Sequence, residues 1–582
     1  MSIFSKVAIT KPKKSVFDLS HSSRITCEAG KIVPVFCQYT MPGDKWSINV
    51  GTFGRTLALL APMMQEVNID IHFFSVPLRL CWENFETFIS GPEKQLTDSS
   101  GNKYWPSDPV HPYFTLSQVA SGYGCATAKY SDVSESDDAG YIMNQDDYGY
   151  LWCTSSLADY LGFPVPKKFD SNYYGDTPFN DSTTKFDPFP FYAYQLIYNE
   201  WYRDENLIDE ITLDNSTDGQ IDTDYLNTSL LPLRSRAWKK DYFTSALPWP
   251  QRGDDVVLSA TGNMSISSSD VTIQSSEGSE ENVIIDSSGY LNTGGADENG
   301  VVNTEGNNTQ WTIEGITGSL KDMSSATIVE VRRAFALQKW FENSARLGSR
   351  YIEQMLSHFG VQSSDARLQR PEYIGGITTP LTINEVVQTS ESTNNSALGS
   401  LAGKGVVVGG NNIGSYYCEE HCIILGLLTI RPKSLYQLGI PRQYNMFERF
   451  DFPYPEFANI GEQAILKQEL SYNNFDGSVY YNSNQVDTFG YTPRYAEFKF
   501  IPSTVHGEFK NTLEYWTMSR SYDISDVELN EAFINIDEAS ESNKRPFAYQ
   551  AAGNDDYIIQ LNFDVKAVRP LPYYSVPGYL DN

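Results

Sequence analysis

The chain has 582 residues, and its 43 Lys and Arg residues against 73 Asp and Glu give a formal net charge of −30. A charge of this sign repels nucleic acid and anionic membranes on average, so contact with either has to be local. The 37 Tyr and 31 Phe residues favour a β-rich fold with bulky core material. The composition therefore indicates a large folded protein and excludes a generally basic nucleic-acid binder.

Two further exclusions concern compartment and cysteine chemistry. No stretch approaches the roughly 20 apolar residues of a membrane span, and residues 1–14 lack an apolar signal core. We therefore expect that the protein does not insert into a membrane and that it assembles in a cytoplasm. Seven cysteines spread over the chain form no disulfide framework. We expect reduced thiols.

Residues 1–20 are predicted to form a short basic arm. Its clustered cations are Lys6, Lys11, Lys13 and Lys14, and no acidic residue precedes Asp18. Proline at position 12 favours extended backbone. The arm can contact phosphates, or it can instead pack under a neighbouring subunit or be disordered.

Four segments have the pattern of β-strands. Residues 67–74 (VNIDIHFF), 495–500 (YAEFKF) and 559–566 (IQLNFDVK) alternate in polarity, which predicts half-buried strands, and Pro77 should end the first. Residues 422–430 (CIILGLLTI) are apolar throughout, which predicts a strand buried on both faces. Together they indicate a sandwich or barrel whose strands come from both ends of the chain.

Two segments have helical spacing of apolar residues. Residues 191–204 (FYAYQLIYNEWYRD) are one. The other runs from 328 to 360, with Thr327 and Glu330 as a capping box and Gly360 at its end. We expect the arginines of this second helix to lie on a solvated or subunit-facing surface.

Residues 253–320 form an acidic insertion with 11 Asp or Glu and no Lys, Arg or Pro. Short apolar bursts recur between Gly, Ser and Asn turns, which predicts short strands rather than disorder. Such a module packs only a thin core, so it is predicted to project from a larger scaffold and to meet solvent or a partner. Its candidate receptor-facing residues are Asp270, Glu277, Glu280, Glu281, Asp286, Asp297, Glu298 and Glu305.

Candidate catalytic chemistry is sparse. Residues 399–405 (GSLAGKG) resemble a phosphate loop but are one residue short and have Gly405 where Ser or Thr must hold magnesium, so a flexible Gly-rich loop is predicted. Cys418, His421 and Cys422 have ligand-like spacing without a second pair, and Cys422 opens an apolar strand, which favours a core thiol. We predict no catalytic, cofactor or metal site.

Longer blocks outside the insertion resemble the major capsid protein of the Microviridae, small icosahedral single-stranded DNA phages, and the gokushovirus-like branch most. They include 17–21 (FDLSH), 30–35 (GKIVPV), 73–79 (FFSVPLR), 157–162 (LADYLG), 194–204 (YQLIYNEWYRD), 241–250 (DYFTSALPWP) and 491–495 (YTPRY). This resemblance implies a mainly β fold, an eight-stranded viral jelly roll of two Greek keys with long loop, helix and β-rich insertions.

The resemblance also implies partners and a domain order. It implies about sixty copies in a closed icosahedral shell around a single-stranded DNA genome, with a small basic DNA-associated protein. Minor pilot or spike proteins and a host-cell receptor complete the expected partners. The expected divisions are an arm at 1–20, jelly roll at 21–204, an insertion at 205–327 with its acidic protrusion at 253–320, a helix at 328–360, and the remaining jelly roll at 361–582.

We therefore interpret the chain as a structural, non-enzymatic capsid protein of a virion. In this interpretation it assembles through aromatic loop surfaces and presents the insertion to the host, while the basic arm at Lys6, Lys11, Lys13 and Lys14 faces DNA. The alternative is a carbohydrate-binding or carbohydrate-active β-sandwich with aromatic sugar platforms, which would form only small oligomers.

Overall fold

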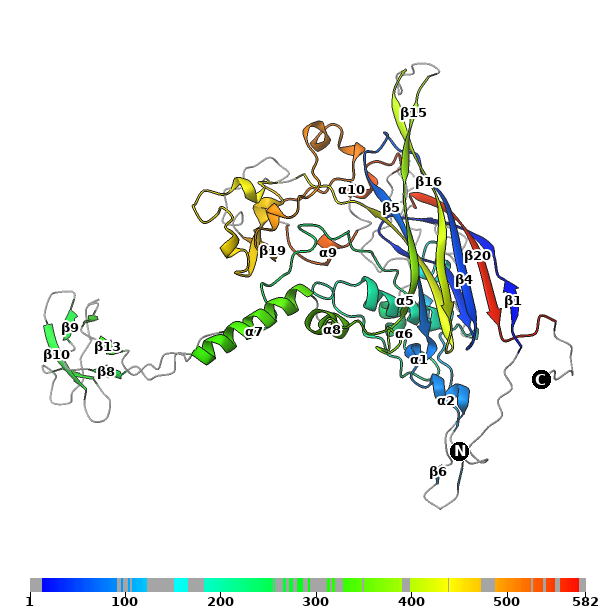
Figure 1. The fold of residues 1–582 in the computed structure, drawn as a ribbon, viewed down its shortest axis with the longest axis horizontal. Helices are drawn as coiled ribbons and strands as arrows, with labels where there is room; N and C mark the ends of the chain where they lie inside the picture. The colour runs from blue at the N-terminus through cyan, green and yellow to red at the C-terminus, as the bar shows by residue number, and fades with distance from the viewer. Residues whose placement is uncertain are drawn as a thin grey trace. The chain divides into compact units, whose positions relative to one another are not determined.

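The computed structural model describes residues 13–91, 96–97, 103–104, 107–122, 151–165, 183–254, 256, 328–347, 350–389, 398–437, 439–472, 487–524, 527–536, 541–549 and 555–574, and short strands between 265 and 319. The chain forms two compact units (Figure 1). Met1–Pro250 and Ala345–Asn582 make the first, which we call the scaffold. Gln251–Ser344 make the second, which we call the insertion unit.

The scaffold contains two large antiparallel sheets. The first, a six-stranded sheet, holds β1 (Ser15–Asp18), β2 (His21–Cys27), β4 (Lys45–Thr56), β15 (Thr382–Val387), β16 (Leu401–Tyr417) and β20 (Tyr557–Arg569) in the order β1-β20-β4-β16-β15, with β2 also on β20. The second, a four-stranded sheet, holds β3 (Ile32–Thr40), β5 (Val67–Pro77), β14 (Glu372–Pro380) and β17 (Cys422–Pro432) in the order β14-β5-β17-β3.

These orders define a jelly roll. Without the edge additions β1 and β15, the first sheet reads β2-β20-β4-β16 and the second reads β3-β17-β5-β14. Strands from the start of the chain therefore alternate with strands from its end, as two Greek keys require. The predicted mainly β jelly roll is confirmed.

The two sheets are joined by an apolar layer that includes four aromatic rings. Phe36 on β3 lies 5.6 Å from Phe73 on β5, both in the second sheet. The same ring lies 6.3 Å from Trp46 on β4 and 5.5 Å from Phe563 on β20, both in the first sheet. All four are buried. Each buried side chain of this kind contributes about 1.5–3 kcal/mol, and each ring pair contributes about 0.5–1.5 kcal/mol more.

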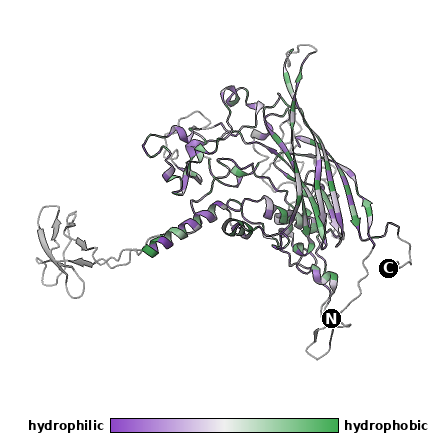
Figure 2. Cartoon of the chain, in the orientation of Figure 1, coloured by the Kyte–Doolittle hydropathy of each residue, from purple (hydrophilic) through white to green (hydrophobic). Residues whose placement is uncertain are grey.

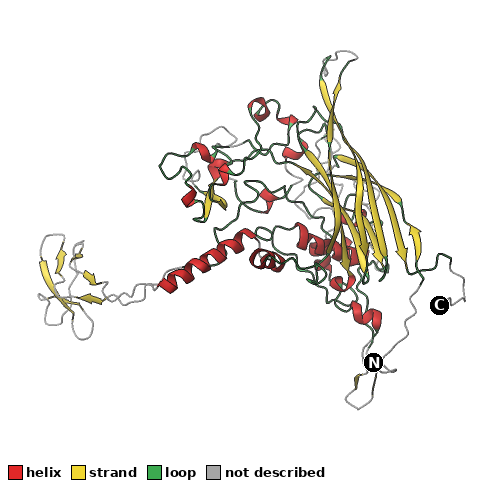
Figure 3. Ribbon diagram, in the orientation of Figure 1, coloured by secondary structure: helices red, strands yellow, loops and turns green. Residues whose placement is uncertain are grey.

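The second sheet is covered by helices on its other face (Figure 3). The cover includes α1 (Leu78–Cys81), α2 (Phe85–Ser90), α3 (Leu116–Gly122), α4 (Leu157–Tyr160), α5 (Phe189–Ile197), the π-helix η3 (Tyr198–Tyr202), α6 (Thr223–Tyr225) and the π-helix η4 (Leu226–Leu230). Phe74 of β5 lies 5.5 Å from Trp201 of η3. The predicted helix at 191–204 is confirmed, divided between α5 and η3.

Three of the four predicted strands are present, and one of them is more buried than predicted. The strand at 422–430 is confirmed as β17, and the alternation at 559–566 is confirmed in β20 and is visible as alternating hydropathy along this sheet in Figure 2. The strand at 67–74 is confirmed as β5, but its half-buried character is wrong. Because η3 covers the outer face, His72 Nδ1 lies 2.9 Å from the Tyr202 hydroxyl, and Asp70 is fully enclosed.

Two local predictions are wrong. Residues 495–500 form no strand, because Tyr495 adopts the left-handed region (φ 61°) and starts the 3-10 helix η10 (Ala496–Phe498). The expected Gly-rich loop at 399–405 is largely the start of β16, paired with β15 on one side. Its glycines permit close packing, since a Cβ at Gly403 would meet the carbonyl oxygen of Ala61.

The predicted single helix at 328–360 is two helices. They are α7 (Ile328–Leu347) and α8 (Tyr351–Phe359), separated at Arg350, whose backbone is extended (φ −62°, ψ 143°). Gly360 ends α8 in the left-handed region, as predicted. Thr327, the expected cap, lies outside the described residues.

The remaining described elements are short. The insertion unit contains β8 (Ser265–Ser267), β9 (Thr272–Ser275), β10 (Glu280–Ile285), β11 (Leu291–Thr293), β12 (Trp311–Glu314) and β13 (Thr317–Ser319), in sheets β11-β10-β9-β12 and β13-β8. The scaffold adds β6 (Leu96–Thr97), β7 (Lys103–Tyr104), β18 (Glu462–Leu466), β19 (Thr488–Pro493), α9 (Glu531–Ile534) and α10 (Glu541–Lys544), with several 3-10 turns. The short strands predicted in the acidic segment are present.

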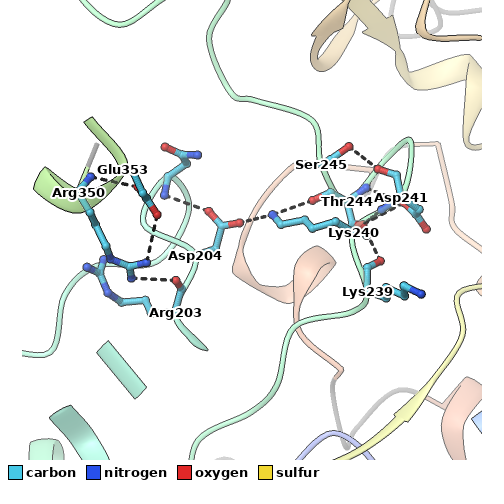
Figure 4. A network of polar contacts seen from close by, with 10 residues as sticks. Arg203, Asp204, Lys239, Lys240, Asp241, Thr244, Ser245, Arg350 and Glu353 are labelled. Atoms are coloured by element: carbon cyan, nitrogen blue, oxygen red, sulfur yellow. Dashed lines mark hydrogen bonds and ion pairs between the residues drawn. The ribbon is translucent and has the colours of Figure 1, made fainter. Parts of the chain in front are cut away.

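A polar network fixes the scaffold near the points where the chain leaves for the insertion unit and returns (Figure 4). On the outgoing side, Lys240 forms an ion pair with Asp204 and donates to the Thr244 carbonyl at 3.0 Å. On the returning side, Arg350 donates to the carbonyls of Asn199 at 2.6 Å and Arg203 at 3.3 Å. Arg350 is therefore held within the scaffold, which corrects the expected solvated or subunit-facing surface at this position.

The close approach at Gly403 gives a first prediction. Gly403→Ala should lower the free energy of unfolding by about 1–3 kcal/mol, because the new methyl group overlaps backbone that cannot move independently. Gly51→Ala is the matched control, since the nearest atoms to its Cβ lie 3.8 Å away. Denaturant unfolding of the unassembled chain measures both, and equal stabilities would contradict the packing argument.

Candidate assembly surface

A group of exposed large apolar side chains, most of them aromatic, lies on loops of the described scaffold rather than on its sheets. It comprises Tyr444, Phe447, Phe450, Phe452, Tyr454 and Ile460 on one segment and Phe498, Phe500 and Ile501 on another. Phe447 is 85% exposed and Ile501 is 92% exposed. We call these nine residues the aromatic loop surface. Exposed apolar groups of this extent mark interaction sites in folded proteins.

Local sequence explains why these aromatics point outward. The carboxylate of Asp451 accepts hydrogen bonds from the backbone N–H of Phe447 at 3.0 Å and of Glu448 at 2.8 Å, which fixes a tight turn. Proline at position 455 then starts the 3-10 helix η7 (Pro455–Phe457). Turns of this kind leave too little regular structure to direct alternate residues toward a core.

The two segments are connected through a buried hydroxyl. The Tyr454 backbone N–H donates to the Tyr495 hydroxyl at 3.3 Å, and η10 begins at the next residue. The Tyr495 N–H in turn donates to the Gln463 side chain on β18 at 3.0 Å. Hydrogen bonds therefore connect both segments of the aromatic loop surface to β18 of the β18–β19 hairpin.

Ion pairs and hydrogen bonds fix the chain on either side of these loops. Arg442 lies 3.6 Å from the Glu469 carboxylate and 3.8 Å from that of Glu497. Glu469 also accepts from the Tyr242 hydroxyl at 2.9 Å, while burial raises the pKa of its carboxyl above the ordinary value. Since leaving any of these groups unpaired costs about 1–3 kcal/mol, these contacts hold the loops in place.

The predicted contact residues fall at separate places. Lys14 donates from Nζ to the Gly43 carbonyl at 2.5 Å and lies 5.4 Å from the Tyr417 ring centre, next to the start of β1. Lys13 precedes it, whereas Lys6 and Lys11 lie outside the described residues. Their role toward DNA stays a prediction.

Two of the predicted receptor-facing residues lie on a described element. Glu280 and Glu281 are on β10 of the insertion unit, opposite Gln274 and Ile273 of β9. The others, Asp270, Glu277, Asp286, Asp297, Glu298 and Glu305, lie outside the described residues. The receptor role of all eight stays a prediction.

The thiols with ligand-like spacing belong to the core. Cys418 and Cys422 are buried, and burial raises their pKa values to about 11 and about 12. The described side chains include no group of three or more His, Cys, Asp or Glu placed to hold a metal ion. Among the described residues, no helix combines the length and apolar character needed to cross a bilayer.

A double-sheet jelly roll with long exposed loops is an architecture of viral capsid proteins and of lectins. Comparison with known proteins separates these classes. The family model for "Capsid protein (F protein)" matches residues 5–122 and 162–579, and the second stretch runs across the insertion unit. The chain belongs to this family of Microviridae capsid proteins.

Individual relatives support the same family assignment. Capsid protein VP1 of Chlamydia phage 1 is 30% identical, covering 99% of this chain and 97% of the relative. Capsid protein VP1 of Bdellovibrio phage phiMH2K is 31% identical with the same coverage, and that of Spiroplasma virus 4 is 27% identical over 97% of this chain and 95% of the relative. The resemblance predicted from the sequence is confirmed, and the family supports a structural role in a virion.

The aromatic loop surface gives a second prediction. Phe447→Asp should prevent assembly while leaving the fold intact, because the side chain is 85% exposed in the free chain but an interface core excludes unpaired charge. Sedimentation and near-ultraviolet circular dichroism measure assembly and fold. Val110→Asp, at a 55% exposed valine away from these loops, is the control. Normal particles from the Phe447 variant would remove this surface from the assembly interface.

Proposed function

We propose that copies of this chain assemble into a closed icosahedral shell that encloses a single-stranded DNA genome. The observation that carries the proposal is the aromatic loop surface, on a chain whose family consists of capsid proteins. Its aromatic rings are of the kind that is enriched at the centre of protein interfaces, and the exposed Arg449 lies beside them in the sequence. About sixty copies would close such a shell.

Charge imposes a requirement on the contents of that shell. About sixty chains at −30 each carry roughly −1800 formal charges, and DNA is also negative. The proposal therefore includes a separate small basic protein with the genome, and minor pilot or spike proteins where the shell needs them. The arm containing Lys6, Lys11, Lys13 and Lys14 supplies local positive charge at one end of the chain.

The insertion is proposed to act in host attachment. It is a compact unit by itself, and its acidic segment at 253–320 contains no basic residue. Such a surface suits a basic, cation-bridged or carbohydrate receptor. Assembly is assigned to the scaffold, because the aromatic loop surface lies wholly within it.

The assignment of assembly to the scaffold and of attachment to the insertion gives a third prediction. Replacing residues 253–320 by a short Gly/Ser linker should leave closed particles, because the scaffold contacts on both sides of the insertion remain. Electron microscopy of the purified variant tests this, with Phe447→Asp as the assembly-defective reference. Loss of all soluble assembled material from the linker variant would assign assembly to the insertion instead.

Attachment gives a fourth prediction. Particles with the linker should fail to adsorb to host cells, as measured by depletion of particles from the medium. A second variant, with the eight predicted receptor-facing acids changed to their amides, separates charge from shape. If both variants adsorb like the parent, the insertion only adds solubility.

A further inference from the structure

The outer face of the six-stranded sheet carries an excess of exposed positive charge. Strand register places five basic residues on this face, Arg24, Lys45, Arg55, Lys404 and Lys566, and all five are exposed. The acids on it are Asp18 and Asp564. A chain of net charge −30 therefore has one sheet face of net charge +3.

Many other cations of the described scaffold have acidic partners. Those paired include Arg79, Lys240, Arg346, Arg370, Arg431, Lys433, Arg442, Lys544, Arg545 and Arg569. Within the part of the chain that the structure describes, Arg24, Lys45, Arg55 and Lys404 form no ion pair. With acids so abundant in the sequence, unpaired cations gathered on one surface indicate an anionic ligand outside the chain.

The same face offers aromatic rings beside the cations. Phe53 lies in one cross-strand row with Arg24 and Val408, and the Arg55 guanidinium is 5.3 Å from the Phe53 ring centre. At the other end, Tyr417 is 52% exposed and lies opposite Lys45. Exposed rings next to guanidinium and ammonium groups are what unpaired bases stack on.

The middle of the face is smooth and rich in amides. Gly51 lies opposite Gly410, and Asn562 completes their row. The next row holds Asn49, Asn412 and the acid Asp564, whose carboxylate accepts a hydrogen bond from the Asn49 amide at 3.2 Å. Glycines permit close approach of a polynucleotide backbone, and amides can donate to phosphates and bases. From Arg55 to Lys45 the face extends about 33 Å along β4, at about 3.3 Å per residue.

We infer that this face, which we call the basic sheet face, binds single-stranded DNA inside the shell. The inference rests on the proposed function and adds the surface that contacts the genome. Lys14, held by the Gly43 carbonyl and the Tyr417 ring, joins the basic arm to the Lys45 end of the face. Lys14 therefore extends the basic sheet face at this end.

Photocrosslinking of intact wild-type particles tests the inference directly. Ultraviolet irradiation followed by mass spectrometry should find nucleotide attached to the peptides that contain Phe53 and Tyr417. Crosslinks confined to other surfaces, or a particle reconstruction with this face against another protein copy, would overturn it. This measurement needs no variant, so it decides even if a variant fails to fold.

A charge variant with a matched control gives the fifth prediction. Arg24→Gln, Arg55→Gln and Lys404→Gln together should reduce packaged DNA and lower the salt concentration at which it is released. The control, Lys239→Gln, Arg367→Gln and Lys510→Gln, removes the same charge at exposed positions off this face. Binding of the unassembled full chain to an oligothymidylate should show a salt slope smaller by about 2 for the first variant only.

The outcomes separate the inference from the proposed function. DNA-filled particles with equal salt response in both triple variants would contradict the basic sheet face and leave the capsid function standing. Wild-type protein that forms no closed particle, or particles that never hold DNA, would instead contradict the proposed function.

Discussion

The contact between the two sheets through the rings of Phe36, Trp46, Phe73 and Phe563 is the interaction on which the rest of the scaffold depends. Phe563 comes from the last strand of the chain, while the other three rings lie within its first 73 residues. The core therefore closes only when β20 inserts between β2 and β4. Because the strands are fixed at both ends of the sequence, long segments can be inserted between them at low cost in loop-closure entropy.

The outer faces of the two sheets differ in what covers them. Helices and aromatic side chains cover the outer face of the second sheet. That face is therefore part of the buried core, and β17 is buried on both sides. The first sheet keeps an outer face with exposed polar and apolar side chains, which alternate with buried residues along β4 and β20 (Figure 2). A subunit of a closed container needs surfaces toward its neighbours, its contents and the exterior. We propose the aromatic loop surface, the basic sheet face and the insertion unit for these three roles, and they share no residues.

Much of the fold could be predicted from periodicity and resemblance, and the errors have physical causes. Apolar alternation located β5 and β20, because side chains alternate across a pleated strand, and an unbroken apolar run located β17. It failed at 495–500, where the left-handed backbone of Tyr495 starts a 3-10 turn that no alternation reveals. It also could not show that η3 covers β5, or that Gly403 lies in a strand, since both depend on distant segments. The basic sheet face was missed for the same reason, as its cations come from four strands between residues 24 and 566 and meet only through register.

The central claim is that the scaffold of this chain builds a closed shell around nucleic acid. Electron cryomicroscopy of the assembled full-length protein tests it most directly. The account predicts an icosahedral particle with the aromatic loop surface buried between copies and the basic sheet face lining the interior. Small oligomers with the aromatic loops open to solvent, as a carbohydrate-binding sandwich would form, would contradict it.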